Sequence, residues 1–188
     1  RQDAILVVDE AHALGIFGPR GAGCWAELAA QGELENVPLI RVGTFSKALG
    51  SYGGFVAGSA SLIELLVNRA RGFIYSTALP PPALGAAGEA LTILEREPEL
   101  GRRLQALAAE FRTALRQQGL SLPEAPSPIV PVLLGDNARA LAVSQSLEAQ
   151  GVVCTAIRPP TVPPGTARLR FSVTLGHRPE DLHRAAAA

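Results

Sequence analysis

The sequence predicts an α/β protein in two parts, the later part of a large sheet domain followed by a small α+β domain. The run from Ala4 to Val8 is continuously apolar, as in the buried strands of parallel sheets. Turn-forming residues fill LPEAPSP (122–128), and short strand and helix patterns alternate after it. We therefore assign residues 1–97 to the large domain and 98–188 to the small domain with its leading helix.

In the first part, a turn-rich loop, GIFGPRGAG (15–23), follows the first strand. Two further strands are predicted at 38–42 and 54–57. Ser61 and Glu64 have the spacing of a capping box, which opens a helix to about residue 71. A second helical pattern covers 84–97, after a run of three prolines.

In the second part, a helix to about residue 118 places its apolar residues on one face. From 168 to 175, Arg168 and Arg170 alternate with apolar residues, which predicts a half-buried strand with both arginines on its polar side. The other predicted elements are strands at 129–134 and 152–156, a helix at 138–150, a proline-rich loop at 158–165 and a short helix after Pro179.

Composition excludes several classes of protein. Apolar residues make up 47% and charged residues 18%, with a net charge of zero, so we expect a globular protein without the basic surplus of a nucleic-acid binder. No segment approaches the roughly 18 apolar residues that span a bilayer. The two cysteines, Cys24 and Cys154, fit neither a disulfide framework nor a metal cluster. We expect a cytoplasmic protein without a metal site or a membrane partner.

Lysine is nearly absent from the chain. Of 17 basic residues, 16 are arginine and one, Lys47, is lysine. A guanidinium stays protonated at physiological pH, whereas a lysine amine can act as a nucleophile and form a Schiff base with an aldehyde cofactor. Lys47 lies among small and hydroxyl residues, including Thr44 and Ser46, whose hydroxyls can donate to a phosphate. We expect a cofactor site at this lysine.

The stretch AILVVDEAH (4–12) has two interpretations. In an ATP-driven helicase, Asp9 and Glu10 would hold Mg²⁺ and activate water. In a pyridoxal-phosphate (PLP) enzyme, Asp9 would face the pyridinium nitrogen at the carboxyl end of a strand, and His12 would lie near the ring. The arginine-rich motif of a second motor domain does not follow, and the one lysine lies in a Schiff-base context. These two facts favour the cofactor strand.

Four stretches carry a resemblance to a known family: VVDEAHALGIFGPRGAG, GTFSKALGSYGGFVAG, FIYSTALPP and AIRPPTVPPGTARLRFSVTLGH. They recur in order from about Ile5 to about His177. The chain resembles the α-oxoamine synthase family of fold-type I PLP enzymes. The resemblance implies the aspartate-aminotransferase-like fold, PLP as cofactor and a homodimer with shared active sites. It also implies that the chain begins midway through a longer protein.

The resemblance assigns a role to each matching residue. Lys47 would hold PLP and move protons at the substrate α-carbon, Asp9 would bind the pyridinium nitrogen, and His12 the phenolic oxygen. Arg170 would grip the carboxylate of the amino-acid substrate. Thr44 would contact the cofactor phosphate, and Ser76 and Thr77 the phosphate of the neighbouring subunit. The remaining candidates are Ser46, whose hydroxyl can also donate to the phosphate, and Arg158 and Thr161 of the proline-rich loop for the acyl substrate.

Within the family, the long run from Ala156 favours the member of biotin synthesis that condenses L-alanine with pimeloyl-CoA or a pimeloyl-carrier protein, with loss of CO₂. The alternative keeps the chemistry but uses glycine with acetyl-CoA or another acyl-CoA. Alanine and glycine differ by one methyl group, worth only about 1–3 kcal/mol in a pocket. A further alternative is a non-catalytic fragment, because the family places a ring-stacking residue and further phosphate contacts upstream of these residues.

Overall fold

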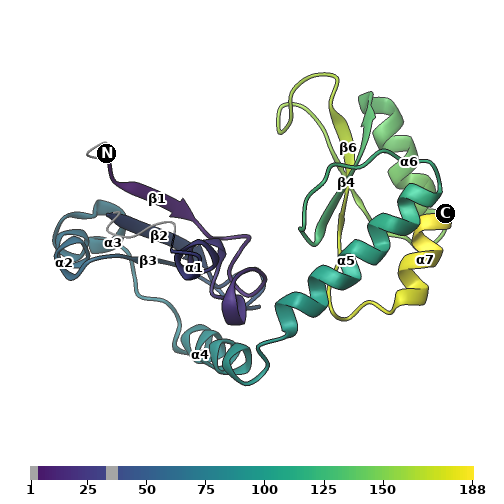
Figure 1. The fold of residues 1–188 in the computed structure, drawn as a ribbon. Coiled ribbons are helices and arrows are strands. Elements are labelled where there is room, and N and C mark those ends of the chain that lie inside the picture. The colour runs from purple at the N-terminus through teal and green to yellow at the C-terminus, as the bar shows by residue number, and fades with distance from the viewer. Residues whose placement is uncertain (1–3, 33–37) are drawn as a thin grey trace. The chain divides into compact units, whose positions relative to one another are not determined.

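The computed structural model describes residues 4–32 and 38–188 (Figure 1). It divides the chain into two compact units, Arg1–Arg102 and Arg103–Ala188, and each contains a three-stranded sheet. Helix α5 (Leu100–Gln117) begins in the first unit and continues into the second. The division into domains after residue 97 stays a prediction.

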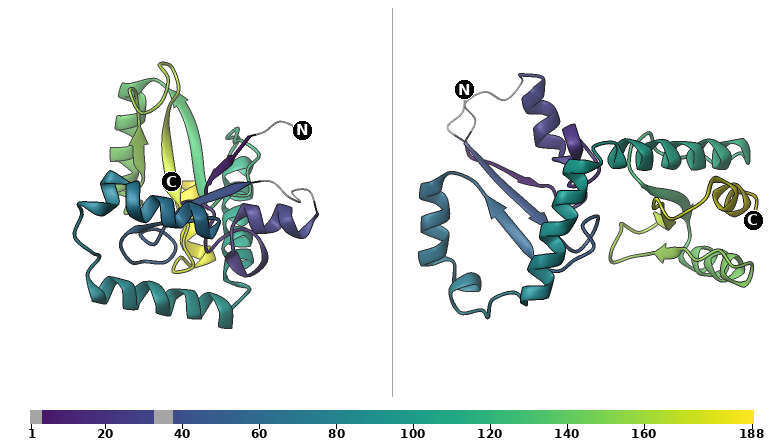
Figure 2. Two further views of the ribbon diagram at one scale, coloured as in Figure 1. Left: turned by 90° about the vertical axis from the view of Figure 1, so that its left-hand side faces the viewer. Right: turned by 90° about the horizontal axis from the view of Figure 1, so that it is seen from below.

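The sheet of the first unit has the order β1-β2-β3. Strand β1 (Leu6–Asp9) runs parallel to β2 (Leu39–Thr44), and β3 (Gly54–Ala57) runs antiparallel to β2. The right-hand view of Figure 2 shows the three strands side by side. Because β1 and β2 are parallel, their carboxyl ends lie at the same edge of the sheet, which is where ligand sites of α/β sheets form.

The helices of the first unit include the predicted ones and several that were not predicted. They are η1 (Pro19–Gly21), α1 (Cys24–Ala30), α2 (Ala60–Arg69), α3 (Arg71–Ile74) and α4 (Pro81–Arg96). No helix is predicted at η1 or α1, and the single helix predicted to about residue 71 is divided at Ala70 into α2 and α3. The predicted capping box is wrong, because Ser59, two residues before Ser61, accepts the hydrogen bond from the Leu62 N–H at 3.3 Å.

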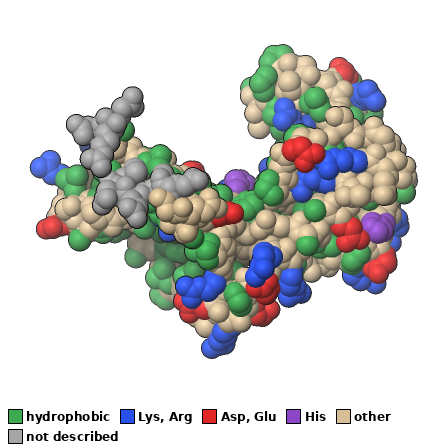
Figure 3. Space-filling view, in the orientation of Figure 1, with side chains coloured by type: hydrophobic (Ala, Val, Ile, Leu, Met, Phe, Trp, Pro, Cys, Tyr) green, Lys and Arg blue, Asp and Glu red, His purple; other side chains and the backbone are tan. Residues whose placement is uncertain are grey.

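The prediction that the first strand is buried is wrong for this structure. Ile5 and Val7 are 66% and 60% exposed. Within the described residues, β1 pairs with β2 on one side and forms an edge of the sheet, and its exposed apolar side chains also lack a covering layer. Figure 3 shows hydrophobic side chains, in green, on the surface of this unit. An apolar strand of this kind is typical of a sheet that pairs with further chain.

The sheet of the second unit is antiparallel, with the order β4-β6-β5. The alternation predicted for β6 is confirmed, because Leu169 and Phe171 are 2% and 8% exposed, whereas Arg170 and Ser172 are exposed. Helix α5 packs its apolar face, including Phe111, into the same core. The elements are β4 (Ile129–Gly135), α6 (Asn137–Ala149), β5 (Thr155–Ile157), β6 (Ala167–Ser172) and α7 (Pro179–Ala187).

A buried arginine anchors the start of this sheet. Arg112 of α5 is 5% exposed, and its guanidinium donates to the carbonyl oxygens of Ser127 and Ile129. Desolvation, followed by the charge of the nearby Arg116, lowers the pKa of Arg112. The hydrogen bonds join α5 to the first residue of β4 and so fix the end of the 122–128 loop.

Candidate active site

Two neighbouring strands of the first unit end at the candidate site. In the parallel register, Asp9, the last residue of β1, pairs with Val42 of β2. Thr44 is the last residue of β2, and Ser46 and Lys47 follow it. The parallel pairing therefore places Asp9 and the segment Thr44–Lys47 at the same end of the two strands.

Asp9 and His12 lie in the turn that leaves β1, and both side chains are exposed. The carboxylate atom Oδ1 of Asp9 accepts a hydrogen bond from the Ala11 N–H at 2.8 Å. This contact lies within the turn, so the position of the carboxylate follows the position of the turn. An exposed carboxylate here has the access that a bound cation or protonated ring requires.

The hydroxyls of Thr44 and Ser46 form a pair. Their oxygen atoms are 2.7 Å apart, the Thr44 hydroxyl donates to the Gly53 carbonyl at 2.9 Å, and the Ser46 N–H donates to the Thr44 oxygen at 3.1 Å. A hydroxyl has one proton, so while Thr44 donates to Gly53, the Ser46 hydroxyl donates to Thr44. A phosphate bound here would draw both protons away from these internal bonds.

Lys47 lies in the loop between β2 and β3, and its side chain is exposed. Two residues later, Leu49 is 5% exposed and anchors the loop to the protein. The Gly50 N–H donates to the Lys47 carbonyl at 3.0 Å, and the φ of Gly50 is +59°, a left-handed conformation that favours glycine. The loop therefore presents its amine to solvent from a fixed backbone.

Glu10 is buried beside the exposed Asp9, with an exposed fraction of 1%. Its two carboxylate oxygens accept hydrogen bonds from the N–H groups of Cys24 and Trp25, each at 2.9 Å. A guanidinium nitrogen of Arg41 lies 3.7 Å from the same carboxylate. A helicase glutamate that activates water has to face its substrate, so the burial of Glu10 counts against the ATP interpretation.

Ser76 and Thr77 follow α3, and both are exposed. The Ser76 hydroxyl lies within hydrogen-bond distance of the carbonyls of Gly72 and Phe73, at 2.9 and 3.0 Å. These are contacts to the preceding helical turn. The contact of Ser76 and Thr77 with a second subunit stays a prediction.

The predicted substrate residues lie in the second unit. Arg170 is exposed on β6, the central strand of its sheet, where it pairs with Pro131 of β4 and Thr155 of β5. Arg158 and Thr161 are exposed in the proline-rich loop, in which the Thr161 N–H donates to the Arg158 carbonyl at 3.0 Å. The structure thus places Arg170 on the face that the sequence predicts.

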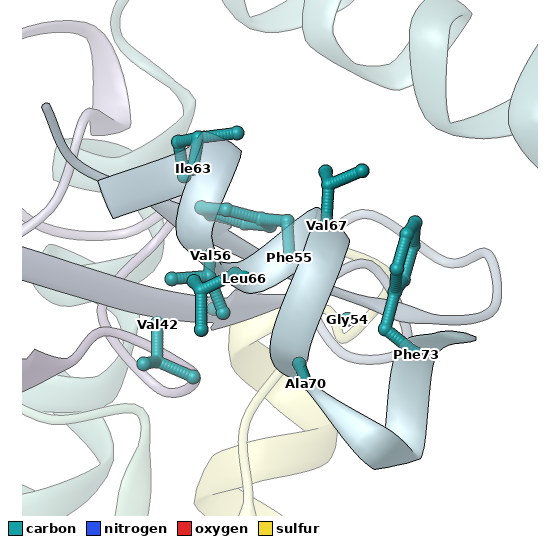
Figure 4. A pocket seen from close by; sticks show the side chains of 10 residues that line it. Val42, Gly54, Phe55, Val56, Ile63, Leu66, Val67, Ala70 and Phe73 are labelled. Carbon is teal, nitrogen blue, oxygen red and sulfur yellow. The ribbon is translucent and has the colours of Figure 1, made fainter. Parts of the chain in front are cut away.

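An apolar pocket of about 520 Å³ lies against the sheet of the first unit and reaches Val42 and Gly54, which pair with Asp9 and Thr44 (Figure 4). Strand β3 contributes Phe55 and Val56, and helix α2 contributes Leu66 and Val67, while Phe73 comes from α3. Its lining contains no acid, base or nucleophile, so it is a hydrophobic cavity. The sequence does not predict this cavity, because its lining residues come from separate segments.

A metal site and a membrane-spanning helix are both absent from the described ranges. In residues 4–32 and 38–188, no cluster of three or more histidine, cysteine or acidic residues has the arrangement of a metal site. In the same ranges, none of the helices has the length and apolar character required to cross a membrane.

Comparison with known proteins gives the class of this fold and site. The aminotransferase class I and II family matches residues 1–188, and the chain belongs to that family. A structure of serine palmitoyltransferase (SPT) with PLP has a TM-score of 0.88 and 34% identity, and the match covers 98% of this chain and 46% of that one. The predicted aminotransferase-like α/β fold is therefore confirmed.

Two further relatives share a second enzyme name, 8-amino-7-oxononanoate synthase. The 8-amino-7-oxononanoate synthase of Methylocella silvestris is 51% identical over 186 residues, which is 99% of this chain and 50% of the relative. The structure of that enzyme from Francisella tularensis has a TM-score of 0.81 and 29% identity, over 96% of this chain and 52% of that one. The resemblance to α-oxoamine synthases is confirmed. The chain spans about half the length of the curated relatives it matches.

Proposed function

We propose that the whole protein carrying this chain condenses L-alanine with a pimeloyl thioester, releasing CO₂ and the thiol, to give 8-amino-7-oxononanoate. The observation that carries the proposal is the juxtaposition of Asp9 with the segment Thr44–Lys47 at the carboxyl ends of two parallel strands. Curated relatives that are 46–51% identical bear the name of this synthase. Their name supports alanine and the pimeloyl group over glycine with another acyl-CoA.

The residues at the strand ends fit PLP as the cofactor. An exposed amine, an exposed carboxylate and a pair of hydroxyls match the aldehyde, the pyridine nitrogen and the phosphate of that molecule. Bound PLP supplies an electron sink that stabilises a carbanion at the substrate α-carbon. The protein supplies the groups that bind it, orient it and move protons.

The residues of the first unit would divide the work as follows. Lys47 would hold the cofactor and, as a free amine, would move the proton at the substrate α-carbon. Asp9 would keep the ring nitrogen protonated, and His12 would bind the phenolic oxygen. The Ser46 hydroxyl, which donates to Thr44, and the Thr44 hydroxyl, which donates to Gly53, would donate to the phosphate instead.

The second subunit completes the site in this proposal. Ser76 and Thr77 are exposed after α3 and reach the phosphate held by the partner copy, which makes the protein a homodimer. Two hydroxyls in an exposed turn have the donors that a phosphate requires. We also assign the protein to the cytoplasm, without a nucleic-acid or membrane partner.

Arg170 binds the carboxylate of L-alanine in the proposed reaction. Its guanidinium projects from the central strand of a sheet and can make the paired hydrogen bonds that a carboxylate accepts. Arg158 and Thr161 bind the acyl substrate, whose carrier is CoA or a carrier protein. A loop with four prolines in 158–165 holds them in a restricted backbone.

The test of the cofactor site is borohydride reduction in the presence of PLP, followed by peptide mass mapping. It is performed on the whole natural protein and on residues 1–188, with Lys47→Ala as the control. We expect a pyridoxyl adduct at Lys47 that the control lacks. An adduct in the whole protein alone would identify the 188 residues as an inactive piece, and folded protein without an adduct in either would overturn the proposal.

The test of the substrates is a release assay for CO₂ and free thiol with L-alanine and pimeloyl-CoA. Glycine and acetyl-CoA replace each substrate in turn. We expect kcat/KM to be highest for alanine with the pimeloyl thioester. A preference for glycine with acetyl-CoA would keep the chemistry and overturn the assigned substrates.

A further inference from the structure

Glu10 is held more firmly than the proposed cofactor residues on either side of it. Its carboxylate is 1% exposed and accepts the N–H groups of Cys24 and Trp25, which open α1. These N–H groups lack acceptors within the helix, so a carboxylate satisfies them and interacts favourably with the positive end of the helix. Arg41, on the neighbouring strand, adds an opposite charge at 3.7 Å.

The packing around this carboxylate leaves no spare room. Gly23, directly before α1, has a φ of +101°. A Cβ atom added to Gly23 would lie 2.0 Å from one carboxylate oxygen of Glu10. The glycine therefore lets the start of α1 approach the glutamate closely enough for two hydrogen bonds of 2.9 Å.

The backbone of Glu10 is equally constrained. Its N–H donates to the Val42 carbonyl at 2.7 Å, which extends the pairing of β1 with β2 by one residue. Its carbonyl accepts the N–H groups of Ala13 and Leu14, each at 2.9 Å, and so closes the turn that contains His12. Asp9 precedes this anchored residue, and its carboxylate bonds to Ala11 inside the same turn.

We infer that Glu10 is a positioning residue, whose buried carboxylate fixes the turn carrying Asp9 and His12 to α1 and to β2. Glu10 would not contact the cofactor or the substrate, because its carboxylate oxygens are buried and already accept the Cys24 and Trp25 N–H groups. It determines where the Asp9 carboxylate lies relative to the Lys47 loop. The inference rests on the proposed function for the part that Asp9 and His12 play at the cofactor.

Asp136 provides a control that separates the positioning role of Glu10 from the general stabilisation of a helix by its cap. Asp136 also caps a helix with a carboxylate, since its Oδ1 accepts the Arg139 N–H at 2.8 Å at the start of α6. It lies in the second unit, on a helix that carries none of the proposed site residues. Asp136→Asn and Glu10→Gln each replace a capping carboxylate by an amide, and only Glu10→Gln alters the turn after β1.

The experiment uses the whole natural protein with Glu10→Gln, Glu10→Asp or Asp136→Asn. Two quantities are measured: the Kd for PLP, by absorbance titration, and the hydrogen exchange of residues 9–14 in the cofactor-free protein. We expect Glu10→Gln to weaken PLP binding at least tenfold and to accelerate exchange at residues 9–14. Glu10→Asp, which keeps the charge, should recover part of both, and Asp136→Asn should change neither.

The inference is overturned if Glu10→Gln lowers the melting temperature yet leaves the PLP affinity and the exchange of residues 9–14 as in the unmodified protein. If Glu10→Gln does not fold, Glu10→Asp is judged by the same two measurements. A natural protein that binds no PLP would refute the proposed function instead, and the exchange measurement would still decide whether Glu10 fixes the turn.

Discussion

The rings of Phe111 and Phe171 pack edge to face, with their centroids 5.4 Å apart and their planes at 73°. This contact joins α5 to β6, and both side chains belong to the core of the second unit. Phe171 directly follows Arg170 on the strand. The burial of the phenylalanine therefore turns the arginine to the opposite, exposed face of the sheet.

Replacement of Phe111 by alanine should destabilise the second unit severely. Phe111 is 1% exposed, and removal of a buried phenylalanine ring costs about 3–5 kcal/mol, including the cavity that remains. Urea unfolding of the whole protein measures this loss. Phe111→Leu is the control and should lose less, because leucine fills part of the same volume. Equal stability of Phe111→Ala and the unmodified protein would contradict the placement of this ring in the core.

Replacement of Arg170 by lysine should weaken amino-acid binding without unfolding the protein. Arg170 is exposed, and a charged hydrogen bond contributes about 1.5–3 kcal/mol, so the KM for L-alanine should rise about 10- to 150-fold. The KM for the acyl thioester should change little. Steady-state kinetics with each substrate varied in turn gives the two values.

Arg168→Lys serves as the matched control for this variant. Arg168 lies on the same strand, and its Nε donates to the Thr166 carbonyl at 2.9 Å. Its replacement should leave the KM for alanine near that of the unmodified protein. If both variants raised the KM for alanine alike, binding of the alanine carboxylate would not be specific to Arg170.

Replacement of Gly23 by alanine should cost more stability than replacement of Gly32. A positive φ of this kind costs a residue with a side chain about 1–3 kcal/mol, and both glycines have one, at +101° and +75°. At Gly23 the new methyl group would also collide with Glu10, whereas at Gly32 none of the residues that the structure describes lies within 4 Å of it. Urea midpoints of the two variants measure the difference. A smaller loss at Gly23 than at Gly32 would contradict the close approach of α1 to Glu10.

Asp181 should titrate below the usual range for aspartate. Hydrogen bonds from Arg178, at 3.0 and 3.3 Å, are the main cause of its lowered pKa, and the charges of Arg178 and Arg184 add to the effect. Because the folded pKa lies below the unfolded one, the contribution to stability is present above pH about 3.8 and is lost as pH falls through the folded value.

Carboxyl NMR measures this titration directly. We expect Arg178→Gln to move the pKa of Asp181 back toward its ordinary value, whereas Arg139→Gln, in α6, should not change it. The effect on stability should be small, because exposed ion pairs contribute little. An Asp181 that titrates identically with and without Arg178 would contradict the pairing.

The sequence predicts those features that depend on close neighbours in the chain. The alternation of Leu169, Arg170 and Phe171 defines the two faces of β6 without knowledge of the rest of the fold. The apolar face of α5 is evident from helical spacing for the same reason, and the structure buries Phe111 and Leu115 in the core. Asp9 is found as a candidate because it follows a short apolar strand, and Lys47 because it is the one lysine of the chain and lies among small and hydroxyl residues.

The features that the sequence does not predict depend on distant contacts. The role of Glu10 requires the N–H groups of Cys24 and Trp25, which lie 14 and 15 residues further on. Ser59, not Ser61, caps α2, because the chain enters the helix two residues earlier than the capping pattern indicates. The exposure of Val7 depends on what pairs with β1, and an apolar run is the same whether or not a further strand covers it.

Lys47 is exposed, and the chain contains no second lysine that could react in its place. Thioesters acylate free amines without a catalyst, and a protonated guanidinium is inert toward them. With 16 arginines and one lysine, the side chains of these residues offer a reactive acyl group a single amine to modify. Uncatalysed acylation of the Lys47 amine would therefore inactivate the proposed site. A cofactor bonded to Lys47 would protect this amine from acylation.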